Sequence, residues 1–206
     1  MSEEKRMIGD YSVLNTMCVG HREIVICEDP KATANERYLC CYVENNSIFE
    51  RYTDGMVSDD YAEIAKLFGE RITAAAVEIL KECEREAEQV GDNPELVQSD
   101  CEPVSWEDSI ENKVVVIKGD ILRPEFRRAT RQLMLCSGGF GAQANARGRT
   151  CFCISLFDGR QTSYYRSDIL GVIAPEKLPQ WAQTGLETAR NIHEQTKEIS
   201  KKEGEE

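Results

Sequence analysis

Short apolar runs separated by polar turns make up the first quarter of the chain. The pairs Asp29-Pro30 and Asn45-Asn46 lie between runs, and both are common in turns. The runs are rich in β-branched and aromatic residues, which favour strands, and they cover residues 11–19, 23–28, 38–43 and 47–52. In the second run, apolar residues occupy successive positions, as in a strand that is buried on both faces. The pattern predicts an antiparallel β-meander.

A helical periodicity begins after this meander. Apolar side chains recur every three or four residues from Tyr61 to Leu80, which is the spacing of one helix face. The Ser-Asp-Asp sequence at 58–60 offers N-cap residues. The helix is predicted to continue through a charged stretch and to end at Gly91, because glycine commonly ends helices.

The second half returns to strand-like runs, which cover residues 113–118, 131–136, 150–157 and 162–166. Asp158-Gly159 is a favourable hairpin turn between the last two. The stretch 92–112 is acidic, contains two prolines, and is predicted to be a linker. Pro175 opens a C-terminal helical segment, which Pro179 and Gly185 are expected to divide.

Together these patterns predict an α+β protein. It has an N-terminal antiparallel β-meander with one long helix, a central β-module with a Gly/Arg-rich loop, and C-terminal helices. The predicted boundaries are 1–91, 92–112, 113–174 and 175–206, and a chain of 206 residues can bury a true core. Whether the two β units share one sheet is left open.

The charge is unevenly distributed. The net charge of −12 disfavours non-specific binding to nucleic acid or acidic lipid. Between Asp120 and Leu170, however, eight arginines, four acids and no lysine give a local charge of +4, which leaves −16 elsewhere. Arginine offers a planar fork for phosphate or carboxylate. Two interpretations stand: the arginines bind a partner, or they pair with acids of the neighbouring helices.

The nine cysteines predict a reducing compartment. Their number is odd, no apolar leader precedes them, and most lie in strand-like runs, where a thiol packs as a small hydrophobe. No pair has the spacing of a zinc site, so no metal is expected. No apolar run is long enough to cross a membrane. We expect a cytoplasmic protein without a membrane partner.

The loop that starts at Gly138 is the best candidate for binding. Its glycines let backbone N–H groups approach an anion, and Arg147 and Arg149 add forks for phosphate. It is neither a Walker A loop nor a Rossmann fingerprint, because the required lysine and the following helix are missing. The alternative is a β–β connection whose arginines pair with Asp120 or Asp168.

Aromatic residues accompany these arginines on the predicted strands, as in proteins that stack single-stranded bases. Alternation along a strand buries about half of such residues. Core packing is therefore expected for most of them, with Tyr164 or Tyr165 exposed. The candidate partner-binding residues are Arg123, Arg127, Gly138, Gly139, Phe140, Gly141, Asn145, Arg147, Arg149, Tyr165 and Arg166.

Signals for catalysis are weak. His21 lies in a predicted turn and His193 on a polar helix, and neither has a neighbour in sequence that suggests a triad or a metal site. A Cys/His pair assembled in space and an acid/base pair among the acids of residues 120–168 stay open. We predict no catalytic residues and no cofactor.

Several stretches resemble a family of accessory proteins of Firmicutes mobile elements. They are Tyr11-x-Val13-Leu14-Asn15, Gly20-x-Arg22-Glu23-Ile24-Val25, residues 113–118, 122–127 and 138–141, Asn145-Ala146-Arg147-Gly148-Arg149 and Asp168-Ile169-Leu170-Gly171. Members of that family are cytosolic proteins encoded on conjugative elements and phages of gut bacteria. The resemblance covers nearly the whole chain apart from 92–112 and the tail.

This resemblance implies an accessory role, and small acidic proteins of such elements often inhibit host defence. The leading expectation is therefore a binding protein that inhibits a CRISPR nuclease, a restriction system or a similar host complex, with a host protein or ribonucleoprotein as partner. The alternative is a nucleotide- or nucleic-acid-binding protein that uses the Gly/Arg loop. A third possibility is an enzyme that cuts RNA with the arginines and an acid.

Overall fold

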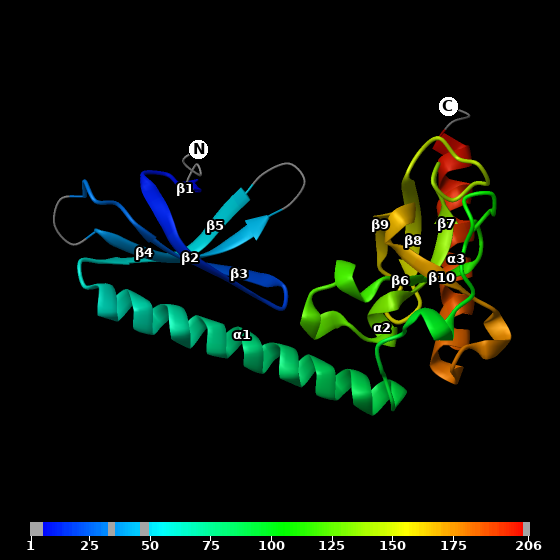
Figure 1. Ribbon diagram of the computed structural model, residues 1–206, viewed down its shortest axis with the longest axis horizontal. Coiled ribbons are helices and arrows are strands. Elements are labelled where there is room, and N and C mark those ends of the chain that lie inside the picture. The colour runs from blue at the N-terminus through cyan, green and yellow to red at the C-terminus, as the bar shows by residue number, and fades with distance from the viewer. Residues whose placement is uncertain (1–5, 33–35, 46–49, 204–206) are drawn as a thin grey trace. The chain divides into compact units, whose positions relative to one another are not determined.

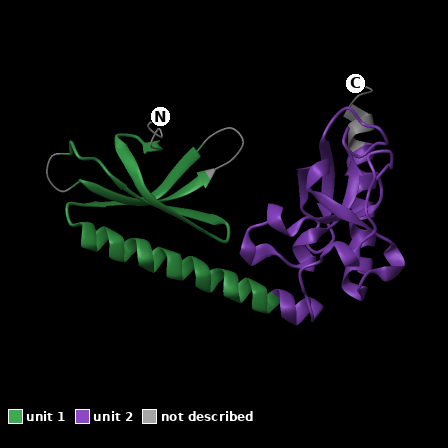
Figure 2. Ribbon diagram, in the orientation of Figure 1, with its two compact units in different colours: residues 1–85 green, residues 86–206 purple. Residues whose placement is uncertain are grey.

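The computed structural model describes residues 6–32, 36–45 and 50–203. It has the predicted α+β composition, with an N-terminal antiparallel sheet, a long helix, a second sheet and a C-terminal helix. The chain forms two compact units, Met1–Arg85 and Glu86–Glu206 (Figure 2). The two sheets are separate, which answers the question that the sequence left open.

The first unit is a meander of five antiparallel strands (Figure 1). They are β1 (Met7–Ile8), β2 (Tyr11–Val19), β3 (Arg22–Glu28), β4 (Tyr38–Asn45) and β5 (Glu50–Ser58). The last strand extends beyond the predicted run 47–52, of which residues 47–49 lie outside the described residues, as does Asn46 of the predicted turn. The strand β5 passes through Asp54-Gly55 with a register shift opposite β4, and Asp54 adopts a φ of 53°.

The helix α1 (Tyr61–Val90) covers one face of this sheet through its residues in the first unit. Its N-terminus is capped as predicted, because the Asp60 carboxylate accepts the Ala62 N–H at 2.7 Å. It ends before Gly91, whose φ is 73°. On β3, Ile24 and Ile26 face the helix while Val25 and Cys27 face the opposite cluster, and all four are buried. The strand is buried on both faces, as predicted.

The second unit is built on another antiparallel sheet, in the order β10-β6-β7-β8-β9 (Figure 1). Its strands are β6 (Val114–Ile117), β7 (Leu133–Gly138), β8 (Thr150–Ser155), β9 (Gln161–Tyr165) and β10 (Ile169–Ile173). The short helix α2 (Ala129–Gln132) leads into β7, and α3 (Gln180–Glu203) follows the sheet. Gly159, with a φ of 70°, forms the predicted turn between β8 and β9.

The helix α3 begins after Pro179, as expected, but Gly185 does not divide it. A Cβ at position 185 would lie 1.8 Å from the Leu156 carbonyl oxygen. Glycine is therefore present for close helix–backbone packing, and the helical hydrogen bonds continue through it. On this face of the sheet, the α3 residues Ala182, Leu186 and Ala189 pack against a cluster that includes Leu135.

The stretch 92–112, predicted to be a linker, packs into the second unit. Ile110 is fully buried among the residues of the opposite sheet face, and Glu102 forms a β-bridge with Val172. The Gln132 amide donates to the Leu96 carbonyl at 3.0 Å and accepts the Leu96 N–H at 2.8 Å. The acidic residues and prolines of the stretch 92–112 suggested exposure, whereas its few apolar residues attach it to the core.

All nine cysteines are free thiols, and six of them are buried. Burial raises the pKa of Cys27 to about 12 and that of Cys41 to about 11, so both remain protonated near neutral pH. No cluster of three or more metal-ligating side chains occurs within residues 6–32, 36–45 and 50–203. In the same described ranges, none of the helices is both long enough and apolar enough to traverse a bilayer.

Candidate functional site

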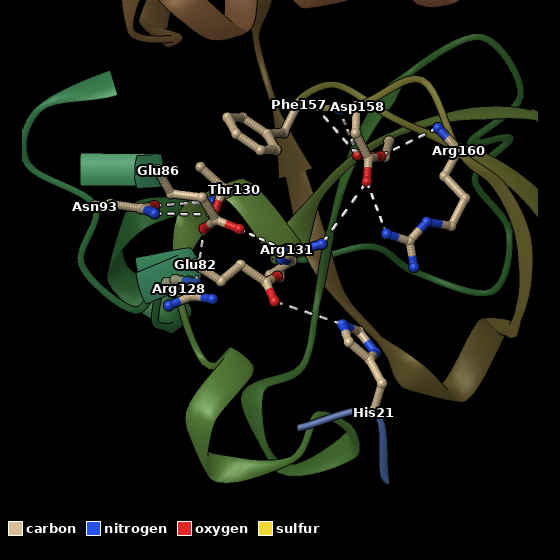
Figure 3. Close-up of polar contacts among 11 residues, drawn as sticks. His21, Glu82, Glu86, Asn93, Arg128, Thr130, Arg131, Phe157, Asp158 and Arg160 are labelled. Atoms are coloured by element: carbon tan, nitrogen blue, oxygen red, sulfur yellow. Dashed lines mark hydrogen bonds and ion pairs between the residues drawn. The ribbon is translucent and has the colours of Figure 1, made fainter. Parts of the chain in front are cut away.

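The eight arginines of residues 120–170 have different structural roles. Arg128 and Arg131 are largely buried and surround Glu86, a residue of the α1 end that belongs to the second unit (Figure 3). Arg128 Nε lies 2.9 Å from Glu86 Oε2, and Arg131 pairs with the other carboxylate oxygen. The Thr130 hydroxyl also donates to Glu86, at 2.9 Å. For these two arginines, pairing with an acid of a neighbouring helix is the correct interpretation.

This buried ion cluster extends to the turn after β8. Arg131 Nη1 lies 3.7 Å from Asp158 Oδ2, and Arg160 Nη2 lies 2.9 Å from the same oxygen (Figure 3). Burial alone would raise the pKa of Asp158, but hydrogen bonding by Ser155 and Arg160 outweighs it and holds the pKa below its usual value. The cluster is a structural element that fixes α2 between the end of α1 and the β8–β9 turn.

Arg166 is buried as well, although it was predicted to contact a partner. Its guanidinium donates to the carbonyls of Gly141 at 2.7 Å, Ser105 at 2.8 Å and Asp108 at 2.7 Å. A longer bond of 3.4 Å reaches the Gln143 carbonyl, and the Trp106 ring lies 5.3 Å away. With 7% of its surface exposed, Arg166 cannot bind a partner directly. It joins the Gly/Arg loop to residues 105–108.

The loop from Gly138 to Arg149 has a defined backbone conformation. Gly139 has a φ of 98°, and a Cβ there would lie 2.5 Å from the Thr150 carbonyl oxygen, so the loop crosses close over β8. The Gly141 N–H donates to the Thr150 carbonyl at 2.8 Å. Asn145, with a φ of 52°, donates its N–H to the Trp106 carbonyl at 3.1 Å. The loop is therefore attached both to β8 and to residues 105–110.

The exposed residues of this loop include one aromatic ring and two arginines. Phe140 is 79% exposed, and Arg147 and Arg149 are also exposed. Within the part of the chain that the structure describes, no hydrogen bond or ion pair involves either guanidinium. The alternative in which these arginines pair with Asp120 or Asp168 is not observed. The Asp168 carboxylate instead accepts the backbone N–H of Tyr165 at 2.9 Å.

Two more exposed rings lie on the adjoining strands. Phe152 on β8 is 55% exposed and Tyr165 at the end of β9 is 59% exposed. In the sheet register, Phe152 is opposite Ser163 and Thr150 is opposite Tyr165, so both rings stand on one face of neighbouring strands. Beside Phe152 the surface forms a shallow pocket that Ser137 and Ser163 also line.

We call this set the arginine–aromatic surface, and it consists of Trp106, Phe140, Arg147, Arg149, Phe152 and Tyr165. Its residues lie where β7 ends, β8 begins and β9 ends, and on the segment that carries Trp106. Phe152 and Tyr165 are on one face of the sheet, whereas the Trp106 segment packs through Ile110 on the other face, that of Cys151 and Cys153. Trp106 is 49% exposed. The surface combines exposed rings with cations, which suits a ligand that carries both flat rings and phosphate.

The predicted site residues divide into two groups. The structure brings together the loop residues from Gly138 to Arg149, Tyr165 and Arg166. Arg123 and Arg127 lie elsewhere in the chain, at the two ends of the short 3-10 helix Pro124–Phe126, and both are exposed. Arg127 donates to the Leu122 carbonyl at 3.4 Å.

The two histidines lie outside the arginine–aromatic surface. His21 is in the first unit, with Nε2 3.7 Å from a Glu82 carboxylate oxygen. His193 is on α3, where burial and the neighbouring Lys197 lower its pKa.

Sequence reasoning missed two parts of the site. Trp106 was assigned to a linker, and the exposure of Phe152 was not predicted. Tyr165 was one of two tyrosines expected to be exposed, and the structure shows that it is, while burial raises the pKa of Tyr164. The burial of Glu86 could have been inferred from the sequence, because Glu86 falls on the apolar face of α1, seven residues after Ile79.

The fold and the surface define a two-unit α+β protein with an exposed arginine–aromatic surface in its second unit. Comparisons with protein-family models, with curated proteins and with solved structures found no match to this chain. The chemistry of the surface itself therefore carries the functional argument.

Proposed function

We propose that the second unit binds single-stranded nucleic acid on the arginine–aromatic surface. Nucleic-acid binding was the second of the functions expected from the sequence, after inhibition of a host defence complex. The observation that carries it is the presence of exposed rings together with Arg147 and Arg149 on the loop and strand ends around β8 and β9, two arginines without an ion pair among the described residues.

The rings supply the stacking part of this binding. Exposed aromatic side chains on a sheet stack unpaired bases, and each base contributes about 1–3 kcal/mol. Phe152 and Tyr165 stand on neighbouring β-strands, so successive bases of one nucleic-acid strand can stack on the two rings. Duplex bases are already stacked and paired, and their faces are not available to these rings.

The arginines supply the phosphate contacts. Arg149 directly precedes Thr150, the strand partner of Tyr165, and its carbonyl accepts the Arg166 N–H at 2.7 Å, so its backbone lies beside the end of β9. Arg147 lies two residues earlier on the same attached loop. Guanidinium groups bind phosphate oxygens through paired hydrogen bonds, and the released counterions make such binding sensitive to salt.

Two features limit the affinity. The chain carries a net charge of −12, and Glu107 and Asp108 directly follow Trp106 on the same segment. Their field opposes a polyanion, so we expect binding with a Kd of about 10⁻⁶ M or weaker at physiological salt, and tighter binding at low salt.

The open shape of the surface favours a strand over a free nucleotide. Sites for small ligands enclose most of the ligand, at about 70–90% of its surface. The pocket beside Phe152 is shallow, and each ring residue is about half exposed or more. A single nucleotide would make few contacts there, whereas a strand makes several at once.

Fluorescence anisotropy tests the proposal with labelled oligouridine and oligoadenine of about 12 nucleotides, a length within the range of known single-strand sites. Both should bind at low salt, and a duplex of the same length and AMP should bind much more weakly. Equal affinity for duplex and single strand would contradict stacking. An absence of binding to any oligonucleotide would remove the proposal.

Two other expectations stay predictions. Inhibition of a host defence complex requires a host protein or ribonucleoprotein, and a ribonucleoprotein would offer the single strand that this surface suits. Adding the protein to a purified guide-RNA nuclease and measuring cleavage tests this directly. RNA cleavage by the chain itself is tested by incubating labelled RNA with the protein, with and without Mg²⁺.

A further inference from the structure

The Arg166 guanidinium is buried and hydrogen-bonded to the backbone of two separate segments. Four backbone carbonyls accept from it, those of Gly141 and Gln143 in the loop and those of Ser105 and Asp108 in the segment before β6. The two groups are far apart in sequence and belong to irregular segments. A single planar guanidinium therefore joins the two segments that carry most of the arginine–aromatic surface.

Trp106 is held by the same arrangement. Its ring lies 5.3 Å from the Arg166 guanidinium, its carbonyl accepts the Asn145 N–H, and 49% of its surface remains exposed. A ring that packs on a buried cation with one side and faces solvent with the other is preorganised for stacking. The segment around it is further fixed by the Ile110 N–H, which donates to the Ala142 carbonyl at 2.8 Å.

We infer that Arg166 is the positioning residue of the arginine–aromatic surface and that it makes Trp106 a stacking residue of that surface. This inference rests on the proposed nucleic-acid binding. Arg166 does not contact the ligand itself, because it is buried. It holds the loop with Arg147 and Arg149 beside the Trp106 ring, so one strand meets the cations and the ring together.

Arg166→Lys is the direct test, because lysine keeps the charge but has no planar fork for four carbonyls. The matched control is Arg160→Lys, an exposed arginine of the β8–β9 turn that pairs with Asp158. A readout without ligand comes first. Trypsin should cleave after Arg147 and Arg149 several times faster in Arg166→Lys than in the wild type or the control, because the loop is released.

Binding of oligouridine gives the second readout. In Arg166→Lys the salt slope should fall by about 0.7 for each phosphate contact that is lost. Adding Arg147→Ala and Arg149→Ala to this variant should then change affinity little, because those contacts are already lost. Full additivity of the substitutions, or an unchanged salt slope together with unchanged trypsin cleavage, would overturn the positioning role.

Trp106→Leu keeps the inference testable if Arg166→Lys does not fold. It removes the ring while leaving all four carbonyls in place. We expect at least a fivefold lower affinity for oligouridine, an unchanged salt slope and unchanged trypsin cleavage, since only stacking is lost. Unchanged affinity would show that Trp106 is outside the binding surface. If wild-type protein binds no oligonucleotide while trypsin still distinguishes Arg166→Lys, the nucleic-acid proposal fails and the positioning of the loop stands.

Discussion

Arg128 and Arg131 differ from Arg147 and Arg149 in every structural respect, although all four belong to one basic stretch of the sequence. The first two are buried around a carboxylate, and the second two are exposed without an acid partner among the described residues. A buried ion pair must be complete, because an unpaired buried charge is very unfavourable. An exposed arginine has no such requirement and is available to a ligand. Local charge alone therefore does not identify a binding site.

Glu86→Ala should have the largest effect on stability. It removes the carboxylate that Arg128 and Arg131 share. Because Glu86 is only 3% exposed, the two guanidiniums lose this anion in a buried site. We expect the second unit to lose about 3–5 kcal/mol of unfolding free energy. Urea denaturation followed by the fluorescence of Trp106 and Trp181 measures this, since both tryptophans lie in that unit.

The matched control for this prediction is Glu84→Ala, an exposed glutamate on the same helix. It should change the unfolding free energy by less than about 0.5 kcal/mol. An equal effect of the two substitutions would show that the buried ion cluster does not stabilise the unit, and the contrast between the two arginine pairs would disappear.

Tyr165→Ala and Phe152→Ala should have the next largest effect, on binding instead of stability. Each removes a ring that is more than half exposed, so the stability cost is small. Loss of one stacked base should weaken oligouridine binding by about 1–3 kcal/mol without changing the salt slope. Anisotropy titrations at several salt concentrations separate these outcomes. Unchanged affinity in both variants would exclude stacking at these positions.

Asp158→Asn should reveal the acid sensitivity of the buried ion cluster. The folded pKa of Asp158 is below its usual value, so the stabilisation is present above that usual value and is lost as the pH falls through the folded pKa. The stability advantage of wild type over Asp158→Asn should therefore be largest near neutral pH and shrink below about pH 4. Parallel urea denaturation curves across this range measure it, with the exposed Asp120→Asn as control. A difference that does not change with pH would contradict the linkage.

The elements of the fold were largely predictable because their signals are local. The stripe from Tyr61 to Leu80 and the cap before it predicted α1, and the Asp158-Gly159 turn predicted the β8–β9 hairpin. The interpretation of 92–112 as a linker assumed that an acidic stretch with prolines stays exposed. In the structure, the buried Ile110 and the β-bridge of Glu102 attach this stretch to the second unit. Such contacts form across long sequence distances and leave no periodic pattern.

The candidate site was predictable only in part. The glycines and arginines of the loop marked its position, and Tyr165 was a candidate for exposure. No local pattern indicated that Arg166 would be buried beside Trp106, because arginine is mostly exposed in proteins and its burial here depends on carbonyls from distant segments. Which arginines are paired depends on the partners that the fold brings near them, and Glu86 comes from a different element.

The salt dependence of oligouridine binding by wild type and by the Arg147→Ala, Arg149→Ala double variant tests the central claim most directly. The account predicts a stable, folded variant with weaker binding and a slope of log Kd against log salt that is smaller by about 1.4, or 0.7 for each lost phosphate contact. An identical slope in the two proteins would contradict the account, because the exposed arginines would then take no part in binding.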